Sequence, residues 1–121
     1  MDLSAHFTST EFECHGIDCC GHTAVVHPWL ILGLEQLRTD IGKPLYISCG
    51  FRCRKHNAET KDAARESWHT QGMAADIYVQ GMDSDAVAAR AEYVTAFRHG
   101  GIGLYTSFVH LDIGPKRRWK G

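Results

Sequence analysis

Histidine and aspartate, two residue types that bind zinc, lie on either side of a glycine in the segment Ser-Trp-His-Thr-Gln-Gly-Met-Ala-Ala-Asp (67–76). Gly72 permits a sharp backbone turn between His69 and Asp76. A lone aspartate in an apolar strand is costly to bury unless it is paired, and a metal ion suits it when a histidine stands just before the turn. We therefore interpret His69 and Asp76 as two ligands of a zinc site.

A third candidate ligand, His110, lies near the C-terminus in the strand-like pattern Phe-Val-His-Leu-Asp-Ile. Apolar residues alternate there with His110 and Asp112, so these two side chains are predicted to share one face of a strand. Two histidines and one aspartate leave one tetrahedral position for water, which is the arrangement of a catalytic zinc. The other six of the eight histidines are expected to be exposed or hydrogen-bonded structural residues.

Strands must position these ligands. We predict a strand over 73–79, with Ala75, Ile77 and Val79 on one face and Ala74, Asp76 and Tyr78 on the other. Further strands are predicted over 45–50, 101–105 and 108–113. The last two are joined as a hairpin through Thr106 and Ser107.

Two helices are expected to cover this sheet. Apolar residues recur every three or four positions over 28–41, between Pro28 and Gly42. The run 83–99 carries a similar stripe, with Asp83 placed to cap its start. The expected fold is α+β, a small antiparallel sheet with helices on one side and zinc on the open face. A chain of 121 residues is the length of one domain, 1–121.

Several separated motifs together resemble the zinc D-Ala-D-Ala carboxypeptidase and murein endopeptidase family (peptidase M15-like), most closely its murein endopeptidase K type. They are Cys49-Gly50-Phe51-Arg52, Ser67-x-His69-x-x-Gly72-x-Ala74-Ala75-Asp76, Gly100-Gly101-Ile102-Gly103, Phe108-Val109-His110-Leu111-Asp112 and Arg117-Arg118-Trp119. The ordered combination is more specific than any one block. The resemblance implies a hedgehog/DD-peptidase-like fold and Zn²⁺-dependent hydrolysis of peptidoglycan stem peptides or cross-links.

The resemblance also implies roles for residues around the zinc. Arg52 would face the metal and hold a substrate carboxylate or the developing oxyanion. Related carboxypeptidases often have an acid three positions before the last histidine ligand, where this chain has Ser107. The general base is therefore unassigned, with Asp112 as the best candidate; we prefer for Asp112 a role in orienting His110. Ser107 also keeps open an alternative function, a zinc-stabilised module that binds cell-wall peptides without cutting them.

Three of the five cysteines, Cys14, Cys19 and Cys20, cluster near the N-terminus. Three interpretations stay open: a disulfide from Cys14 to Cys19 or Cys20, a small second metal site with Cys53 as a fourth ligand, and reduced, partly buried thiols. The spacing does not match the paired Cys-x2-Cys of structural zinc sites, which favours the first and third. An odd count of cysteines argues against an extensive disulfide framework.

The composition and net charge of the chain limit the classes of partner that we expect. The formal net charge of −1 gives no electrostatic footprint for nucleic acid, and the basic residues of 116–120 are expected to form a solvated or substrate-facing edge. No stretch approaches the ~20 apolar residues of a membrane span, and the first ten residues do not resemble a signal peptide. We expect a monomer that is cytoplasmic as synthesised. Two routes stay open: a phage lysin (endolysin) that acts on the cell wall after release, and a cytoplasmic peptidase that acts on recycled wall fragments or D-Ala-D-Ala-like dipeptides. We favour the lysin, because the resemblance is to endopeptidases of intact murein.

Overall fold

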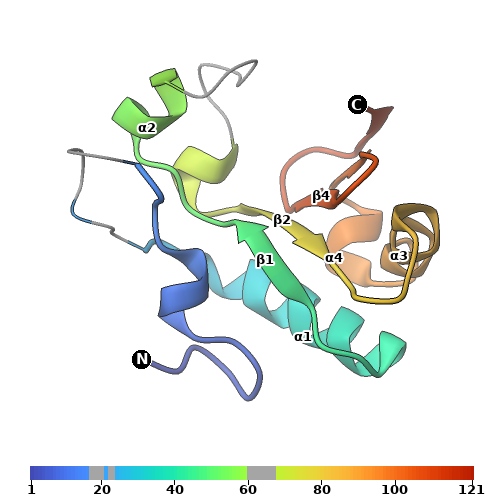
Figure 1. Cartoon of the computed structure of the whole chain (residues 1–121). Helices are drawn as coiled ribbons and strands as arrows, with labels where there is room; N and C mark the ends of the chain where they lie inside the picture. The colour runs from blue at the N-terminus through green and yellow to red at the C-terminus, as the bar shows by residue number, and fades with distance from the viewer. Residues whose placement is uncertain (17–20, 22–23, 60–67) are drawn as a thin grey trace.

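The computed structural model describes residues 1–16, 21, 24–59 and 68–121 (Figure 1). Ser67, Cys19 and Cys20, which the sequence analysis singled out, lie outside the described residues. The elements are η1 (Ser9–Phe12), α1 (Pro28–Ile41), β1 (Tyr46–Cys49), α2 (Arg54–Glu59), η2 (Trp68–Gln71), β2 (Ala74–Tyr78), α3 (Ser84–Ala91), α4 (Thr95–Arg98), β3 (Gly101–Leu104), β4 (Val109–Asp112) and β5 (Arg117–Lys120).

The strands form one sheet in the order β1-β2-β4-β3-β5. All four predicted strands are present, slightly shortened, and pair antiparallel in this order. The predicted hairpin joins β3 to β4, with the Tyr105 amide donating to the Phe108 carbonyl at 3.1 Å across Thr106 and Ser107. The fold class α+β is confirmed.

The prediction of a purely antiparallel sheet is wrong, because β5 pairs in parallel with β3. The sequence Arg-Arg-Trp-Lys lacks the apolar alternation by which strands are predicted, so the sequence analysis expected a solvated or substrate-facing edge there. The partner strand β3 explains this pairing. A Cβ atom on Gly103 would lie 2.4 Å from the Trp119 ring, so only glycine at position 103 leaves room for this indole beside β3.

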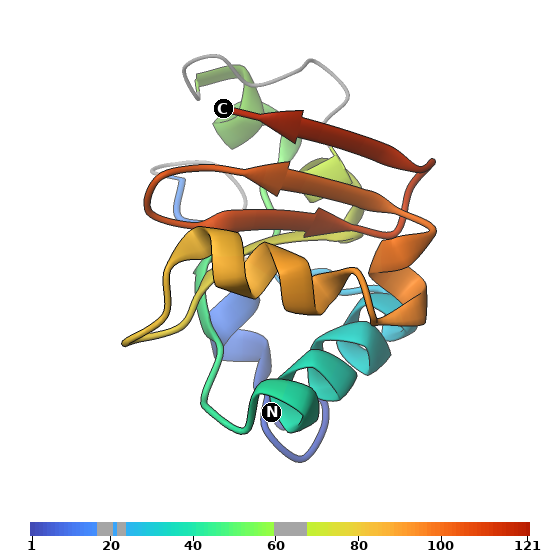
Figure 2. The same cartoon turned by 90° about the vertical axis from the view of Figure 1, so that its right-hand side faces the viewer.

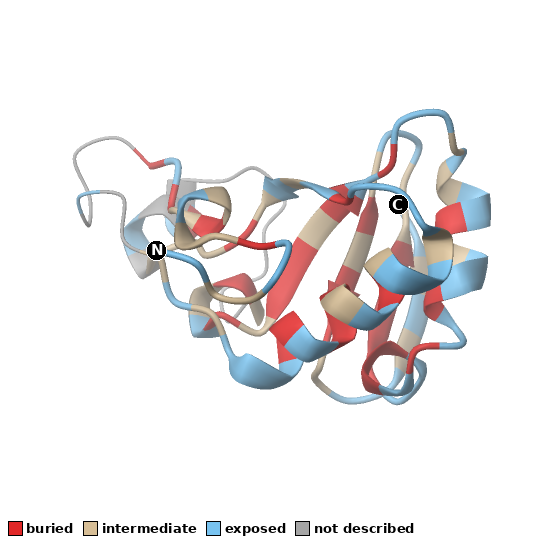
Figure 3. Ribbon diagram, turned by 90° about the horizontal axis from the view of Figure 1, so that it is seen from below, coloured by how far each residue is buried: buried red, intermediate tan, exposed pale blue. Residues whose placement is uncertain are grey.

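Three helices, α1, α3 and α4, lie together on one side of the sheet, as predicted (Figures 1 and 2). Buried positions gather between these helices and the sheet (Figure 3). The core there includes Leu34, Ile77, Phe97, Val109 and Leu111, each fully buried. The inward face of β2 and β4 is therefore apolar, and the polar residues of the same strands must point to the opposite face.

Helix α1 has the predicted bounds, from Pro28 to Ile41. The His27 side chain caps its start by accepting a hydrogen bond from the Trp29 amide at 3.1 Å, and Gly42 ends it at φ 75°. His27 is thus a structural histidine, as expected.

The single helix predicted over 83–99 is wrong, because the chain forms α3 and α4 with a break between them. Val94 has extended backbone angles (φ −92°, ψ 120°) just before α4. Val87, Ala91, Val94 and Phe97 are nevertheless all buried. The apolar stripe therefore continues across the break, which is why the periodicity indicated one helix. Within the described residues, no helix has the length and apolar character needed to cross a membrane.

Candidate metal centre

Neighbouring strands bring two of the predicted ligands together. In the antiparallel register of β2 and β4, Asp76 lies directly opposite His110. Directly opposed residues of antiparallel strands have Cβ atoms about 5 Å apart, so their side chains can meet. His110 Nδ1 lies 2.9 Å from Asp76 Oδ1. The pair is on the face of the sheet that the three core helices leave uncovered.

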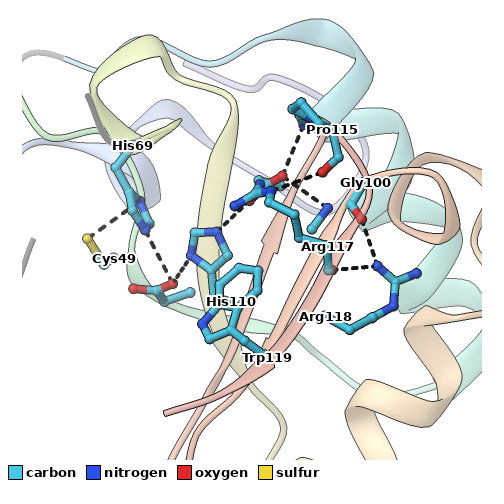
Figure 4. Close-up of polar contacts among 12 residues, drawn as sticks. Cys49, His69, Gly100, His110, Pro115, Arg117, Arg118 and Trp119 are labelled. Atoms are coloured by element: carbon cyan, nitrogen blue, oxygen red, sulfur yellow. Dashed lines mark hydrogen bonds and ion pairs between the residues drawn. The ribbon is translucent and has the colours of Figure 1, made fainter. Parts of the chain in front are cut away.

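The third predicted ligand, His69, reaches the same oxygen from η2. His69 Nε2 lies 3.3 Å from Asp76 Oδ1 (Figure 4). Its other ring nitrogen, Nδ1, lies 2.7 Å from the Gly50 carbonyl oxygen. A carbonyl only accepts hydrogen bonds, so Nδ1 carries a proton and Nε2 is the nitrogen available to a metal.

Gly72 makes the turn that places His69, as the sequence predicted. Its φ is 69°, and an added Cβ would lie 2.4 Å from the Val25 carbonyl oxygen. The turn is also fixed by a hydrogen bond from the His27 amide to the Gly72 carbonyl at 2.8 Å. Any side chain at this position would combine a strained backbone with a backbone clash.

The side chains of His69, Asp76 and His110 interact strongly. Burial disfavours a charged imidazole, but hydrogen bonds to Asp76 and Cys49 outweigh it and raise the pKa of His69 to about 9. Burial likewise opposes ionisation of Asp76, yet hydrogen bonds from His110 and His69 hold the pKa of its carboxyl well below its usual range. Asp76 is therefore an anion between two imidazoles. A divalent cation suits this donor set, since it would take the place of the shared protons.

Cys49 also lies at this centre, although the sequence analysis named it only as the first residue of the Cys49-Gly50-Phe51-Arg52 motif. Its Sγ is 3.8 Å from His69 Nδ1, and the ligand atoms of Cys49, His69 and Asp76 lie within 4.8 Å of one another. Cys49 ends β1 beside β2, opposite Asp76. Only this pairing shows that the thiol faces the centre.

Asp112 lies behind His110 and is completely buried. One oxygen, Oδ2, lies 2.8 Å from His110 Nε2 and 2.6 Å from an Arg117 guanidinium nitrogen. The other, Oδ1, accepts hydrogen bonds from the amides of Gly101 and Gly114, each at 3.0 Å. Both oxygens are thus engaged, and the carboxylate holds His110 with Nε2 protonated and Nδ1 directed at Asp76.

Arg117 and two tryptophans line the centre beside His110. The sequence analysis expected Arg117 on a solvated or substrate-facing edge and assigned the tryptophans no role. The Arg117 guanidinium lies 5.2 Å from the ring centroid of Trp119 and 5.9 Å from that of Trp68. The Trp119 ring lies 5.2 Å from that of His110. The Arg-Arg-Trp motif within the family resemblance was the signal for two of these residues, but their placement depends on β5.

Arg52, the predicted oxyanion residue, is half-buried and joined to the centre through its backbone. Its amide donates to the His69 carbonyl at 3.1 Å, which ties the segment after β1 to η2. Ser107 lies in the β3–β4 turn and is exposed. A separate hollow of about 670 Å³, lined by residues such as Tyr78, Ser84 and Tyr105, includes none of the candidate ligands.

Comparison with known families identifies the family of this chain. The model of the family described as peptidase M15 matches residues 5–112 of the chain. The chain belongs to the peptidase M15 family. The match includes His69, Asp76, His110 and Asp112, and the predicted family is therefore confirmed.

Two relatives in the comparison show which proteins of the family this chain is similar to. It is 32% identical over 103 residues to a protein named probable peptidoglycan L,D-endopeptidase MepK from Haemophilus influenzae. It is also 32% identical over 102 residues to peptidoglycan L,D-endopeptidase MepK of Escherichia coli K12. Each match covers 78% of this chain and 54% of the relative. The chain thus spans about half the length of the relatives that it matches.

Proposed function

We propose that this protein is a zinc-dependent peptidase that hydrolyses peptide bonds of peptidoglycan stem peptides or cross-links. The observation that carries the proposal is the convergence of His69 Nε2 and His110 Nδ1 on one oxygen of Asp76. In a catalytic zinc site three protein ligands of this kind leave a position for water. The names of the M15 relatives supply the substrate class, and among M15 activities they favour an endopeptidase over a D-Ala-D-Ala carboxypeptidase.

His69, Asp76 and His110 would hold the metal. Bound zinc supplies a Lewis acid that polarises the scissile carbonyl and lowers the pKa of water. The Gly50 carbonyl fixes the ring of His69, and Asp112 fixes that of His110, so both imidazoles are oriented before any metal arrives. Asp112 has no exposed surface and both of its oxygens are engaged, so it orients a ligand rather than accepting a proton from water.

Two arginines belong to segments that adjoin this centre, and Arg52 would act on the substrate. Arg52 follows β1 and is held to the His69 carbonyl, where its guanidinium would stabilise negative charge on the reacting carbonyl oxygen. Arg117 neutralises Asp112 from β5 and packs between Trp68 and Trp119. The two indoles would give the substrate a rigid apolar wall next to the ligand His110.

The first experiment is digestion of purified peptidoglycan, with released muropeptides identified by mass spectrometry. The zinc-loaded protein should release new fragments, whose masses identify the bond cut. His110→Ala should abolish both zinc retention and fragment release, because it removes a ligand. His99→Ala is the matched control, since His99 is exposed and lies outside the centre.

An unchanged muropeptide profile for the zinc-loaded protein, across several wall types, would contradict a peptidase. If that protein still sedimented with peptidoglycan, the zinc-stabilised binding module would be the better description. Zinc analysis finding no metal after expression in zinc-supplemented medium would contradict the metal centre itself.

We also propose that the protein acts on the wall from outside the cytoplasmic membrane, because intact peptidoglycan lies there. Expression alone should leave cells intact. Co-expression with a pore-forming protein should cause lysis that depends on His69. Absence of lysis, combined with hydrolysis of free D-amino-acid dipeptides in vitro, would instead favour an enzyme of wall-fragment recycling.

A further inference from the structure

Four aromatic side chains lie in one row across the sheet, next to the candidate metal centre. Tyr46 of β1 pairs with Tyr78 of β2. One residue beyond the last pair of β2 and β4, the same register places Tyr78 opposite Phe108. The Tyr105 amide donates to the Phe108 carbonyl at 3.1 Å, which pairs these two residues in the β3–β4 hairpin. The aromatic row therefore runs from β1 through β2 and β4 to β3.

The aromatic row is on the face of the sheet that the three core helices leave uncovered. Side chains alternate between the two faces along a strand. Ile77 is fully buried in the core on the helical side, so the adjacent Tyr78 points to the opposite face. Asp76 shares that face two positions before Tyr78, and His110 does so two positions after Phe108. At about 3.4 Å per residue, the row is about 7 Å from these two candidate ligands.

The four rings are stacked in two pairs. The ring centroids of Tyr46 and Tyr78 are 5.3 Å apart, with an interplanar angle of 19°. Those of Tyr105 and Phe108 are 4.4 Å apart, with an angle of 10°. Tyr46 and Tyr78 are 38% and 39% exposed, and the other two residues are half-buried. Each pair restricts the rotation of its rings, so the row presents ordered aromatic surface to solvent.

Trp119 connects the aromatic row to the candidate metal centre. Its Nε1 donates to the Tyr105 hydroxyl at 3.0 Å, and its ring lies 5.2 Å from that of His110 (Figure 4). An extended peptide advances about 3.5 Å per residue, so two or three residues of a stem peptide span the distance from the centre to the row. A peptide held at the centre can therefore place its attached sugar on the row.

The chemistry of the row matches sugar better than peptide. Its phenol and phenyl side chains carry no charge at neutral pH, and they offer flat apolar faces together with hydroxyl groups. Stem peptides carry charged carboxylates, whereas the N-acetylated sugars of a glycan strand are uncharged. A pyranose ring has a face of C–H groups that packs on an aromatic ring, and its hydroxyl and acetamido groups exchange hydrogen bonds with phenols. Nucleic acid would require positive charges, which the row lacks.

We propose that Tyr46, Tyr78, Tyr105 and Phe108 form a subsite for the N-acetylated sugar rings of a glycan strand. The inference rests on the proposed function, which supplies peptidoglycan as the substrate, and it makes that function more specific. The preferred substrate is a stem peptide that is still attached to its sugar. Tyr46 and Tyr78 are the most exposed of the four and provide the main contact surface. The subsite binds the sugar and takes part in no covalent step.

Kinetics with two matched substrates test the proposal. One is a cross-linked muropeptide that retains its sugars, and the other is the same cross-linked peptide after an amidase has removed them. Wild type should have a KM about 3–10-fold lower for the sugar-bearing substrate, the scale of one aromatic contact. Tyr78→Ala should remove this preference. Tyr93→Ala is the matched control and should retain it, since Tyr93 is 81% exposed and lies outside the row.

Binding of peptide-free glycan strands tests the subsite without catalysis. Such strands, prepared with an amidase, contain no peptide bond to cut, so wild-type protein can be used. Isothermal titration calorimetry should detect binding by wild type and by Tyr93→Ala. The double variant Tyr46→Ala/Tyr78→Ala should bind at least about tenfold more weakly, because two ring contacts are lost. If the double variant fails to fold, NMR signals of the Tyr46 and Tyr78 rings in wild type should shift on addition of the strands.

Three results would overturn the proposal. They are equal KM values of wild type for the two substrates, a sugar preference that Tyr78→Ala retains, and no binding of peptide-free strands by wild type. Each would mean that the aromatic row only stabilises the sheet through cross-strand pairs. If wild type cuts neither substrate, the peptidase proposal fails and the binding measurement alone decides the subsite, so failure of the two proposals is distinguishable.

Discussion

Asp112 shows how hydrogen bonds stabilise a single buried charge beside the candidate metal centre. Its two oxygens are engaged by His110, Arg117 and the amides of Gly101 and Gly114. Burial alone would favour the neutral acid, yet hydrogen bonds from His110 and Arg117 hold the pKa of Asp112 below its usual range. The residue is therefore an anion that fixes His110.

We predict that Asp112→Asn weakens zinc binding by ~10–100-fold, as is typical for loss of a group that orients a metal-bound histidine. The amide keeps the size of the side chain but removes the charge that Arg117 and His110 share. Competition with a zinc chelator measures this affinity. Asp40→Asn, at an exposed ion pair with Arg90, is the control and should leave the affinity unchanged. Equal affinities in the two variants would refute the orienting role.

Arg52 is a second residue-scale case, because its predicted role is in the reaction and not in metal binding. Arg52→Ala should retain zinc and lose ~100-fold or more in hydrolysis rate, as for removal of an oxyanion stabiliser. Zinc content and muropeptide release, measured on the same preparation, check both parts. Arg98→Ala is the exposed control. Activity of Arg52→Ala equal to that of wild type would show that the oxyanion role is wrong.

At the scale of elements, the turn between η2 and β2 decides whether His69 reaches the centre. Gly72 and Gly42 have nearly the same backbone conformation, with φ of 69° and 75°. Only at Gly72 would an added Cβ collide with another backbone segment, at 2.4 Å from the Val25 carbonyl oxygen; at Gly42 it would meet nothing within 4 Å. Substitutions at these two glycines therefore separate the free-energy cost of the left-handed backbone from the cost of the steric clash.

We expect Gly42→Ala to lower the free energy of unfolding by about 1–2 kcal/mol, the cost of left-handed backbone for a residue with a Cβ. Gly72→Ala should cost more, because the clash adds to it, and should also weaken zinc binding by displacing His69. Urea denaturation measures the first effect and zinc content the second. Equal stability loss in both variants, with full zinc in Gly72→Ala, would mean that the turn does not position the ligand.

The β5 strand is the second element that places side chains at the candidate metal centre. Arg118 fastens it by an ion pair with Glu92 at 2.8 Å and by donating to the Gly100 carbonyl at 2.7 Å. Its neighbours Arg117 and Trp119 face the centre beside His110 (Figure 4). One short strand thus connects the helical layer to the wall of the proposed active site.

At the scale of the whole molecule, Glu35 of α1 holds the N-terminal segment. Its carboxylate accepts hydrogen bonds from Ser4 Oγ at 2.5 Å and the His6 amide at 2.8 Å, and it pairs with the His6 ring. Burial raises the pKa of Glu35, but the hydrogen bonds from Ser4 and His6 outweigh it and lower the pKa below the usual value. The folded state therefore favours the ionised form.

The pH dependence of stability follows from the lowered pKa of Glu35. A carboxyl group whose pKa is lower in the folded state stabilises the protein above its unfolded pKa, and this contribution is lost as the pH falls through the folded pKa. At neutral pH, Glu35→Gln should lower the free energy of unfolding by about 1 kcal/mol, the scale of a partly buried charged hydrogen bond. The difference from wild type should shrink below about pH 4.5. Denaturation series at several pH values check this, and a constant difference would contradict it.

The sequence alone indicated the candidate metal ligands and most of the architecture. Period-two alternation and a three-to-four spacing are local consequences of strand and helix geometry, so they were visible in 73–79, 108–113 and 28–41. The residue types His, Asp and His, with a glycine between the first two, indicated metal chemistry because few other arrangements make a buried aspartate acceptable.

Only the tertiary structure decided the rest, because it depends on pairing between distant segments. Arg117–Lys120 forms a strand along β3, where Gly101 and Gly103 leave room for its side chains. The chain breaks before α4, and Val94 and Phe97 on either side of the start of α4 are both buried in the core. The register of β1 on β2 places Cys49 at the centre. The approach of Cys14 to Cys53 likewise brings together two segments whose contact no local pattern records.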